Sequence, residues 1–202
     1  MEHDPMRQSS PDNPGDAMTP SLLLGKRTTW TESEFLAIGE TPERIELFDG
    51  SLHVTPGPTP IHQRFAGKLL ITLTPPAESI GLLVFEGINV RVGTNRIPIP
   101  DLAITTMIDL EELVVDASAV RLVCEILSPS NATTDRVLKM RYYADAGIPW
   151  YLLVAPKTAT FTLYKLDGAN YREHATASPG ELLELTEPVV ATIDPADLLP
   201  PR

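Results

Sequence analysis

Basic residues are scarce in this sequence. Lys and Arg number 16 among 202 residues, Asp and Glu number 27, and the formal net charge at pH 7 is −11. Proteins that bind nucleic acid without sequence preference are usually basic, because contacts with phosphate dominate their affinity. The charge therefore argues against a histone-like or repressor-like role. It does not exclude a nuclease, in which carboxylates hold a divalent metal and a few basic residues act locally.

Cysteine and long apolar runs are also nearly absent. The single cysteine, Cys124, excludes a disulfide within the chain and a cysteine-rich zinc site, which favours a reduced, cytoplasmic setting. No run of about 18 apolar residues occurs, so we expect no membrane-spanning helix. Residues 1–21 lack the apolar core of a signal peptide and are rich in Pro, Ser and Asp, which predicts a disordered tail. We expect residues 22–202 to form one domain.

The order of the predicted elements indicates a layered domain. Asp49-Gly50 lies between two alternating apolar runs, which is a strong hairpin signal, and Pro75-Pro76 is expected to end the longest helix. Helices are predicted over 31–38, 61–73 and 134–146, and strands over 44–48, 51–55, 82–85, 88–92, 101–105, 121–127, 149–154, 160–166, 171–175 and 181–185. This order is typical of an α/β or α+β fold with a mixed β-sheet flanked by helices and preceded by a helix and a hairpin.

Glu125 is the most informative carboxylate in the chain. It lies within the apolar run 121–127, which is typical of a central, buried strand. Burying an unpaired carboxylate is costly, so Glu125 must have a partner or lie at a hydrated strand end. A chemical role and a structural ion pair are both open at this point. The cations available for such a pair are Arg121, Arg136 and Lys139.

Asp101 and Lys139 are two further candidates. Asp101 follows Ile97-Pro-Ile-Pro100, whose prolines fix an extended backbone, and it begins a predicted strand. As a purely structural residue it would be a solvated aspartate at a strand edge. Lys139 lies within the predicted helix 134–146, where most lysines extend along the surface. Two carboxylates and a lysine are, however, the residue types that metal-dependent phosphodiester cleavage requires.

An ordered series of short motifs runs through the same part of the chain. The motifs are Ile45-Glu-Leu-Phe-Asp-Gly-Ser-Leu52, Pro60-Ile-His62, Pro100-Asp-Leu-Ala103, Val123-Cys-Glu-Ile-Leu-Ser-Pro-Ser130, Asp135-Arg-Val-Leu-Lys139, Tyr143, Ala146-Gly-Ile-Pro149 and Tyr151. The series resembles the Uma-two family of restriction-endonuclease-like proteins, a branch of the PD-(D/E)XK superfamily of metal-dependent nucleases. The resemblance covers roughly residues 30–198. It implies a restriction-endonuclease-like fold.

The resemblance also implies catalytic roles. Asp101 would be the motif aspartate and Glu125 the second carboxylate, and together they would hold Mg²⁺, with Mn²⁺ as an alternative. Members of the superfamily usually place the catalytic lysine two residues after the second acid. That position is Leu127 here, which is a departure from the pattern. The Uma-two pattern places the lysine on the following helix, where Lys139 is the matching residue.

Three supporting residues match the family series as well. Glu46 would add a carboxylate or orient a ligand, although it could instead pair with a cation across the hairpin. His62 would lie at the site, although a lone helical histidine more often caps a helix or forms a hydrogen bond than binds metal. Asp135 precedes Lys139 by four residues, so the two could form an ordinary ion pair on one helix face.

Three functions remain open on the sequence alone. The first, which we favour, is an Mg²⁺-dependent endonuclease that hydrolyses phosphodiester bonds of DNA through Asp101, Glu125 and Lys139. The second is a non-catalytic regulatory or protein-interaction domain that retains the nuclease fold, with its acids held in salt bridges. The third is a metal-dependent hydrolase of a small phosphorylated substrate. We also expect a homodimer, because two sites related by two-fold symmetry suit the cleavage of both strands.

Overall fold

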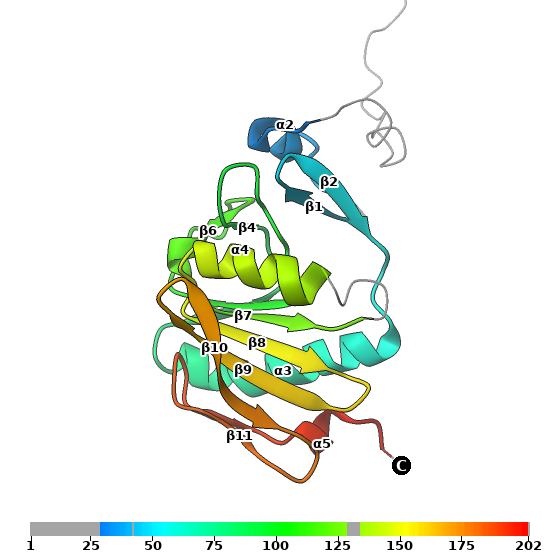
Figure 1. The fold of residues 1–202 in the computed structure, drawn as a ribbon, viewed down its shortest axis with the longest axis vertical. Helices are drawn as coiled ribbons and strands as arrows, with labels where there is room; N and C mark the ends of the chain where they lie inside the picture. The colour runs from blue at the N-terminus through cyan, green and yellow to red at the C-terminus, as the bar shows by residue number, and fades with distance from the viewer. Residues whose placement is uncertain (1–28, 42, 129–133, 202) are drawn as a thin grey trace, which may run out of the picture.

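A six-stranded mixed sheet forms the centre of the molecule. The computed structural model describes residues 29–41, 43–128 and 134–201, so the predicted tail at 1–21 lies outside the described residues. The sheet order is β10-β9-β8-β7-β5-β3. Its strands are β3 (Leu83–Glu86), β5 (Leu102–Thr105), β7 (Val120–Ile126), β8 (Trp150–Ala155), β9 (Thr160–Asp167) and β10 (Asn170–Ala177). Figure 1 shows β7, β8 and β9 side by side across the middle of the fold.

The strand β7 is central, as its continuous apolar sequence predicts. It pairs antiparallel with β5 on one side and parallel with β8 on the other. The parallel pair requires a crossover, which is supplied by a π-helical turn (Thr134–Lys139) and α4 (Met140–Asp145). Gly147 then adopts a positive φ of 76° just after α4, as expected for a glycine that ends a helix. The crossover places α4 over one face of the sheet.

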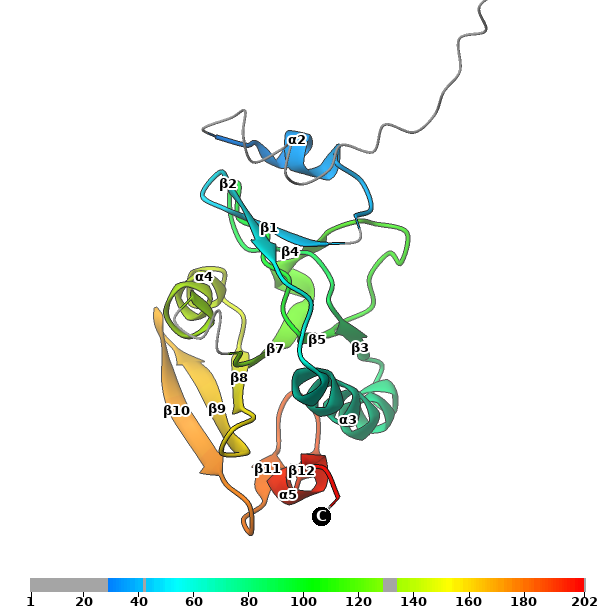
Figure 2. The same ribbon diagram turned by 90° about the vertical axis from the view of Figure 1, so that its right-hand side faces the viewer.

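The two faces of the sheet are covered by different helices. Helix α3 (Pro60–Glu78) packs Phe65, Leu69 and Leu73 against the face of β7 that carries Leu122, Cys124 and Ile126. Helix α4 packs Tyr142 and Tyr143 against the opposite face, with Val123 and Ala103. Figure 2 shows α3 and α4 on either side of the sheet. Because side chains alternate along a strand, Glu125 belongs to the face of Val123, under α4.

A small N-terminal unit lies beside the sheet without joining it. It consists of α2 (Glu32–Leu36) and the hairpin of β1 (Arg44–Phe48) and β2 (Ser51–Thr55). Thr31 and Glu34 form the capping box that begins α2. On β1, Ile45 and Leu47 point into a separate apolar cluster with Trp30 and Phe35. Leu47 exchanges two backbone hydrogen bonds with Ile97, which connects the hairpin to the chain leading into β5.

Several predicted elements differ from the observed ones. Helix α3 does not end at Pro75-Pro76 but continues to Glu78. The prolines leave the carbonyls of Ile71 and Thr72 without intrahelical donors, but Ile71 is 71% exposed, so water can solvate that side of the turn while buried Ala77 anchors the other. The predicted strand 181–185 does not extend the main sheet. It forms β11 (Leu183–Leu185), which pairs only with β12 (Ala191–Ile193).

The remaining differences concern short elements. The predicted strand 88–92 is reduced to β4 (Val90–Arg91), which pairs in parallel with β6 (Val115–Asp116) rather than with the main sheet. A three-residue 3-10 turn, Ala117–Ala119, leads from β6 into β7. The short helix α5 (Pro195–Leu198) was not predicted, and it follows β12 against α3. In the described part of the chain, no helix has both the length and the apolar character needed to span a bilayer.

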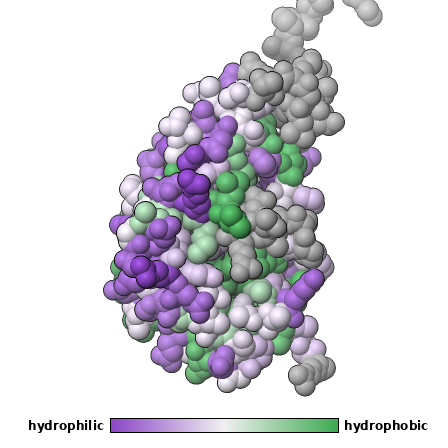
Figure 3. Space-filling model, viewed as in Figure 1, coloured by the Kyte–Doolittle hydropathy of each residue, from purple (hydrophilic) through white to green (hydrophobic). Residues whose placement is uncertain are grey.

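The visible surface is largely hydrophilic. On the face shown in Figure 3, hydrophilic side chains predominate and the hydrophobic areas are small. The exposed large apolar residues of the described chain are spread over several elements, including α3, the turns near β6 and the C-terminal segment. Apolar residues scattered singly are normal on a protein surface and identify no interface.

A polar cluster ties the tip of the hairpin to α4. Asp49 lies in the turn, with φ 49°, and accepts hydrogen bonds from the Tyr142 hydroxyl at 2.6 Å and from Arg96 Nε at 2.5 Å. The Arg96 guanidinium lies 4.6 Å from the centre of the Tyr142 ring. Burial, together with the hydrogen bond to Asp49 and its charge, raises the pKa of Tyr142 to about 12, so the phenol stays protonated as a donor.

Removal of this hydroxyl should weaken the attachment of the hairpin. We expect Tyr142→Phe to lower the free energy of unfolding by about 1 kcal/mol, measured by urea denaturation, because the hydrogen bond is lost while the ring packing is kept. Asp49→Asn keeps an acceptor oxygen for Tyr142 but turns its NH₂ group towards Arg96, whose pair with Asp49 is partly exposed, so a change of similar size is expected. Equal stability of Tyr142→Phe and the wild type would show that the contact does not hold the hairpin.

Candidate active site

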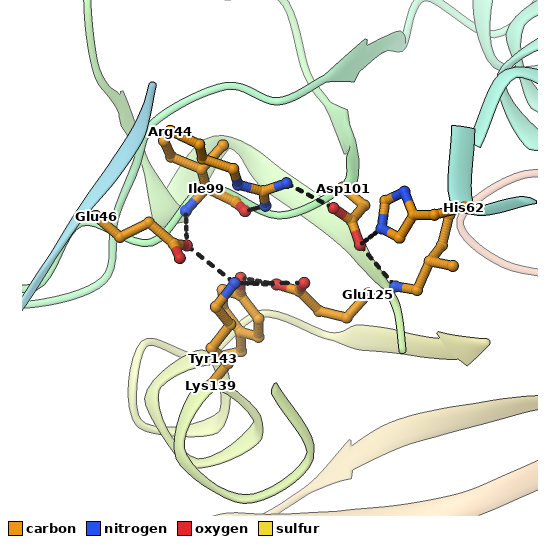
Figure 4. Close-up of polar contacts among 9 residues, drawn as sticks. Arg44, Glu46, His62, Ile99, Asp101, Glu125, Lys139 and Tyr143 are labelled. Carbon is orange, nitrogen blue, oxygen red and sulfur yellow. Dashed lines mark hydrogen bonds and ion pairs between the residues drawn. The ribbon is translucent and has the colours of Figure 1, made fainter. Parts of the chain in front are cut away.

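Asp101 and Glu125 are brought together by the register of two neighbouring strands. Leu102 of β5 pairs with Cys124 of β7, so the same register, continued by one residue, sets Asp101 beside Glu125. Residues directly opposite each other in an antiparallel pair have Cβ atoms about 5 Å apart. Asp101 Oδ2 also accepts the backbone N–H of Ile126 at 2.7 Å. Both carboxylates are buried, and they lie on the sheet face that α4 covers (Figure 4).

Strand β1 contributes a cation and a third carboxylate. Arg44 and Glu46 are two residues apart, so both project from the same face of the hairpin. Pro98 and Pro100 have no N–H, which leaves Ile99 with the only backbone donor in that stretch. Glu46 Oε1 accepts this N–H at 2.7 Å, and the Arg44 guanidinium donates to the Ile99 carbonyl. Side chains of β1 thus bind both backbone groups of Ile99.

Lys139 joins the two halves of this cluster. Its Nζ lies 2.9 Å from Glu46 Oε1 and 3.3 Å from Glu125 Oε1, and its side chain is 2% exposed. The π-helical turn Thr134–Lys139 ends at this residue, and such wide turns are frequent at functional sites. A lysine this deeply buried is not the surface residue that its helical position usually implies. One ammonium group therefore bridges a carboxylate of the hairpin and a carboxylate of the central strand.

Tyr143 also contacts Glu125. It lies four residues after Lys139, so both side chains emerge from the same side of the helix. Its hydroxyl donates to Glu125 Oε1 at 2.6 Å. Burial and the nearby charge of Glu125 raise the pKa of Tyr143 well above its usual value, which keeps the phenol protonated as a donor. Glu125 is consequently held in a single orientation from the α4 side.

His62 approaches Asp101 from the first turn of α3. Its Nε2 lies 3.0 Å from Asp101 Oδ2, while Asp101 Oδ1 accepts from Arg44 at 2.7 Å. Helix α3 begins with the Thr59 cap and Pro60, so its positive N-terminal end faces the carboxylate. Burial raises the pKa of Asp101. The hydrogen bond from His62 and the charge of Arg44 outweigh this effect and lower that pKa to about 2.

The lowered pKa of Asp101 predicts a dependence of stability on acidity. A carboxyl group whose pKa is lower in the folded state stabilises that state above the unfolded pKa, about 3.8, and the contribution disappears as the pH falls towards 2. The shift corresponds to about 2 kcal/mol. In metal-free buffer, the difference in unfolding free energy between wild type and Asp101→Asn should shrink between pH 5 and pH 2. A difference that stays constant over this range would contradict the ionic role of Asp101.

The charges of the cluster nearly balance. Glu46, Asp101 and Glu125 carry three negative charges, and Arg44 and Lys139 carry two positive ones, which leaves −1 when His62 is neutral. Burial lowers the pKa of Arg44, but the charges of Asp101, Glu125 and Glu46 raise it overall, so the guanidinium stays charged. The network can accept further positive charge only at its carboxylate oxygens.

The donor set is suited to a hard divalent cation. Carboxylate oxygens are the ligands that Mg²⁺ and Mn²⁺ prefer, and Mg²⁺ usually takes one or two protein carboxylates and fills its other positions with water and substrate phosphate. Among the described residues, no three His, Cys, Asp or Glu side chains are grouped closely enough to hold a metal ion. Asp101 and Glu125 offer oxygens of the kind that such an ion takes, and the described residues form no complete protein cage.

The structure brings together five of the six residues selected from the sequence. These are Glu46, His62, Asp101, Glu125 and Lys139. The side chain of Asp135 lies outside the described residues, so its predicted supporting role stays a prediction. Leu127, the usual lysine position of the superfamily, is a partly buried apolar residue packed in the α4 cluster. Glu46 does not pair across the hairpin but with Lys139 on the crossover helix.

Sequence reasoning missed two members of the cluster. Arg44 drew no attention, although its two-residue spacing from Glu46 on an alternating strand was a usable signal. Tyr143 appeared only as one member of the motif series, with no role of its own. It is a core residue, but its hydroxyl also contacts Glu125, and its four-residue spacing from Lys139 was the available signal.

Comparison with known proteins bears on the fold and the family of this chain. A solved structure from Anabaena variabilis ATCC 29413, described as "a putative nuclease belonging to DUF820", superposes with a TM-score of 0.66 at 18% sequence identity, over 83% of this chain and 96% of that one. At this identity the similarity establishes the fold, a mixed sheet flanked by helices. None of the curated proteins matches the sequence. The model of the Uma2 family, described as "Putative restriction endonuclease", matches residues 32–196, and the chain therefore belongs to the Uma2 family.

Proposed function

We propose that this protein is a divalent-metal-dependent endonuclease that hydrolyses phosphodiester bonds of DNA, with Asp101, Glu125 and Lys139 as its catalytic residues. The observation that carries the proposal is the burial of two carboxylates on adjacent strands, with one lysine ammonium in contact with Glu125. Burying these charged side chains is costly. Charged side chains that are nevertheless buried beside oriented hydrogen-bond donors are typical of functional sites. Membership of the Uma2 family supports the nuclease reaction.

Each residue has a role that follows from its contacts. Asp101 and Glu125 would hold Mg²⁺ or Mn²⁺. When bound, such an ion supplies Lewis-acid activation of the phosphodiester and of the attacking water. Lys139 Nζ, held at 2.9 Å from Glu46, would donate a hydrogen bond to the attacking water or to a phosphate oxygen, where negative charge develops during cleavage. His62 and Arg44 hold the Asp101 carboxylate in place, and Tyr143 does the same for Glu125.

Calorimetric titration tests the metal requirement directly. Mg²⁺ and Mn²⁺ are titrated into the wild type and into Asp101→Ala, each with and without a short DNA duplex, because a substrate phosphate can complete the coordination. Binding to the wild type that is lost in Asp101→Ala supports the proposal. A wild type that binds neither ion, even with DNA, would favour a non-catalytic domain in which the cations Arg44 and Lys139 permanently neutralise the acids.

We further propose that the protein forms a homodimer. Two copies of the site related by a two-fold axis suit an enzyme that acts on both strands of a duplex, including one that is locally opened. The support for this proposal is the chemistry of the substrate rather than any surface of the protein. Light scattering should give twice the chain mass of 22.1 kDa, and a mass equal to one chain would contradict it.

A further inference from the structure

A pocket of about 440 Å³ adjoins the acid cluster on the side of His62. Its walls are mostly apolar and come from three separate elements, namely the start of α3, the end of β7 and the turn between β8 and β9. The lining residues include Ile61, His62, Leu127, Ala155, Pro156 and Lys157. The volume lies within the range of pockets that bind small ligands.

The pocket and the acid cluster have His62 in common and lie next to each other along the chain at residues 126 and 127. The His62 ring lines the pocket, and its Nε2 contacts Asp101. Leu127 follows Ile126, whose N–H donates to the same carboxylate. A phosphodiester placed at Asp101 and Glu125 would therefore lie beside the pocket, close enough for the base of an adjoining nucleoside to enter it. Lys157, on the exposed rim, adds a cation that suits a backbone phosphate.

The apolar walls of the pocket narrow the class of ligand. Ile61, Leu127, Ala155 and Pro156 offer hydrophobic contacts and no charge. In a DNA strand, the bases present flat, uncharged faces, whereas every unit of the backbone carries a charged phosphate. The apolar walls therefore favour a base over a backbone segment.

We propose that this pocket binds one unpaired nucleobase next to the phosphate that is cleaved, so that the preferred substrate is single-stranded or locally opened DNA. The inference rests on the proposed nuclease function and names its substrate class. A base stacked and paired in a duplex cannot enter a concave pocket and must first leave the helix, which costs unstacking and unpairing. A base in a single strand avoids most of that cost. Binding should therefore favour single strands over the matching duplex, by about tenfold or more.

Binding measurements on two matched variants test this proposal. Ile61→Glu places a charge on the pocket wall, and glutamate is well tolerated in the first turn of a helix. Ile71→Glu makes the same change on the same helix, at a residue that is 71% exposed and does not line the pocket. Ala155→Leu fills part of the pocket without adding charge. Fluorescence anisotropy, with Ca²⁺ and fixed salt, gives the affinity for a labelled single strand, for its duplex and for an abasic strand of equal length.

The abasic strand separates pocket binding from general electrostatics. We expect Ile61→Glu and Ala155→Leu to weaken binding of the normal single strand by about tenfold and to leave binding of the abasic strand unchanged. Ile71→Glu should behave like the wild type with both strands. Equal weakening by Ile61→Glu and Ile71→Glu, or equal loss with normal and abasic strands, would overturn the base pocket while leaving the nuclease proposal intact. Failure of the wild type to bind or cleave any DNA would overturn both.

Discussion

Lys139→Met should lower the free energy of unfolding by about 3–5 kcal/mol, the range found when one partner of a buried ion pair is removed. The ammonium group contacts Glu46 and Glu125, and each of these side chains is at most 4% exposed. Methionine fills a similar volume but leaves two buried carboxylates without their shared cation. Chemical denaturation at pH 7 measures the loss.

Two further variants test this explanation. Lys165→Met removes a lysine whose pair with Glu187 is at least half exposed on both sides and whose ammonium lies 4.8 Å from the centre of the Trp150 ring, so its effect should stay within about 1 kcal/mol. Adding Glu46→Gln to Lys139→Met removes one of the stranded charges and should restore part of the stability. A Lys139→Met protein as stable as Lys165→Met would show that the two carboxylates do not depend on this lysine.

The second large effect is expected on catalysis. Asp101→Asn and Glu125→Gln should each lower the rate of metal-dependent DNA cleavage by about a thousandfold, since each removes one of the two carboxylates proposed to hold the ion. The amides keep the shape of the side chains but not their charge. Steady-state cleavage of a labelled oligonucleotide, with Mg²⁺ and with Mn²⁺, provides the measurement.

In these variants, a loss of cleavage must be distinguished from a loss of folding. Both native carboxylates accept from several donors, so each amide NH₂ group will face at least one unfavourable contact, and thermal unfolding should accompany the assays. Glu187→Gln, which changes an exposed acid far along the chain from the cluster, should cleave like the wild type. Cleavage at the wild-type rate by folded Asp101→Asn would remove Asp101 from the catalytic residues.

The parts of the fold that periodicity controls were predictable. The hairpin around Asp49-Gly50 lies at the predicted residues, and strand β7 begins one residue earlier and ends one residue earlier than expected. These segments combine a strong local turn or a continuous apolar run with a position in the core. Helix α3 ran past Pro75-Pro76 because the prolines lie in a terminal turn that is partly open to solvent. Short pairings such as β4 with β6 depend on distant partners, which a local pattern does not contain.

The residue types of the site were predictable, but the contacts between these residues were not. Glu125 was evident as an isolated acid in an apolar strand, and the motif series added Asp101 and Lys139. The contact of Lys139 with Glu46 joins residues 93 positions apart, and no local pattern encodes that distance. The spacing of Arg44 from Glu46 was a local signal, but the contact of Arg44 with Asp101, 57 residues away, was not encoded locally.

The hairpin that carries Arg44 and Glu46 forms its own two-stranded sheet and meets the rest of the fold mainly through side chains, apart from backbone contacts such as the Leu47–Ile97 bridge. Such a unit can open without unfolding the six-stranded sheet. Its amide hydrogens should therefore exchange with solvent faster than those of β7 and β8. Each opening would separate Glu46 from Lys139 while leaving Glu125 and Tyr143 in place, so half of the polar cluster would be dismantled and rebuilt many times within the lifetime of one folded molecule.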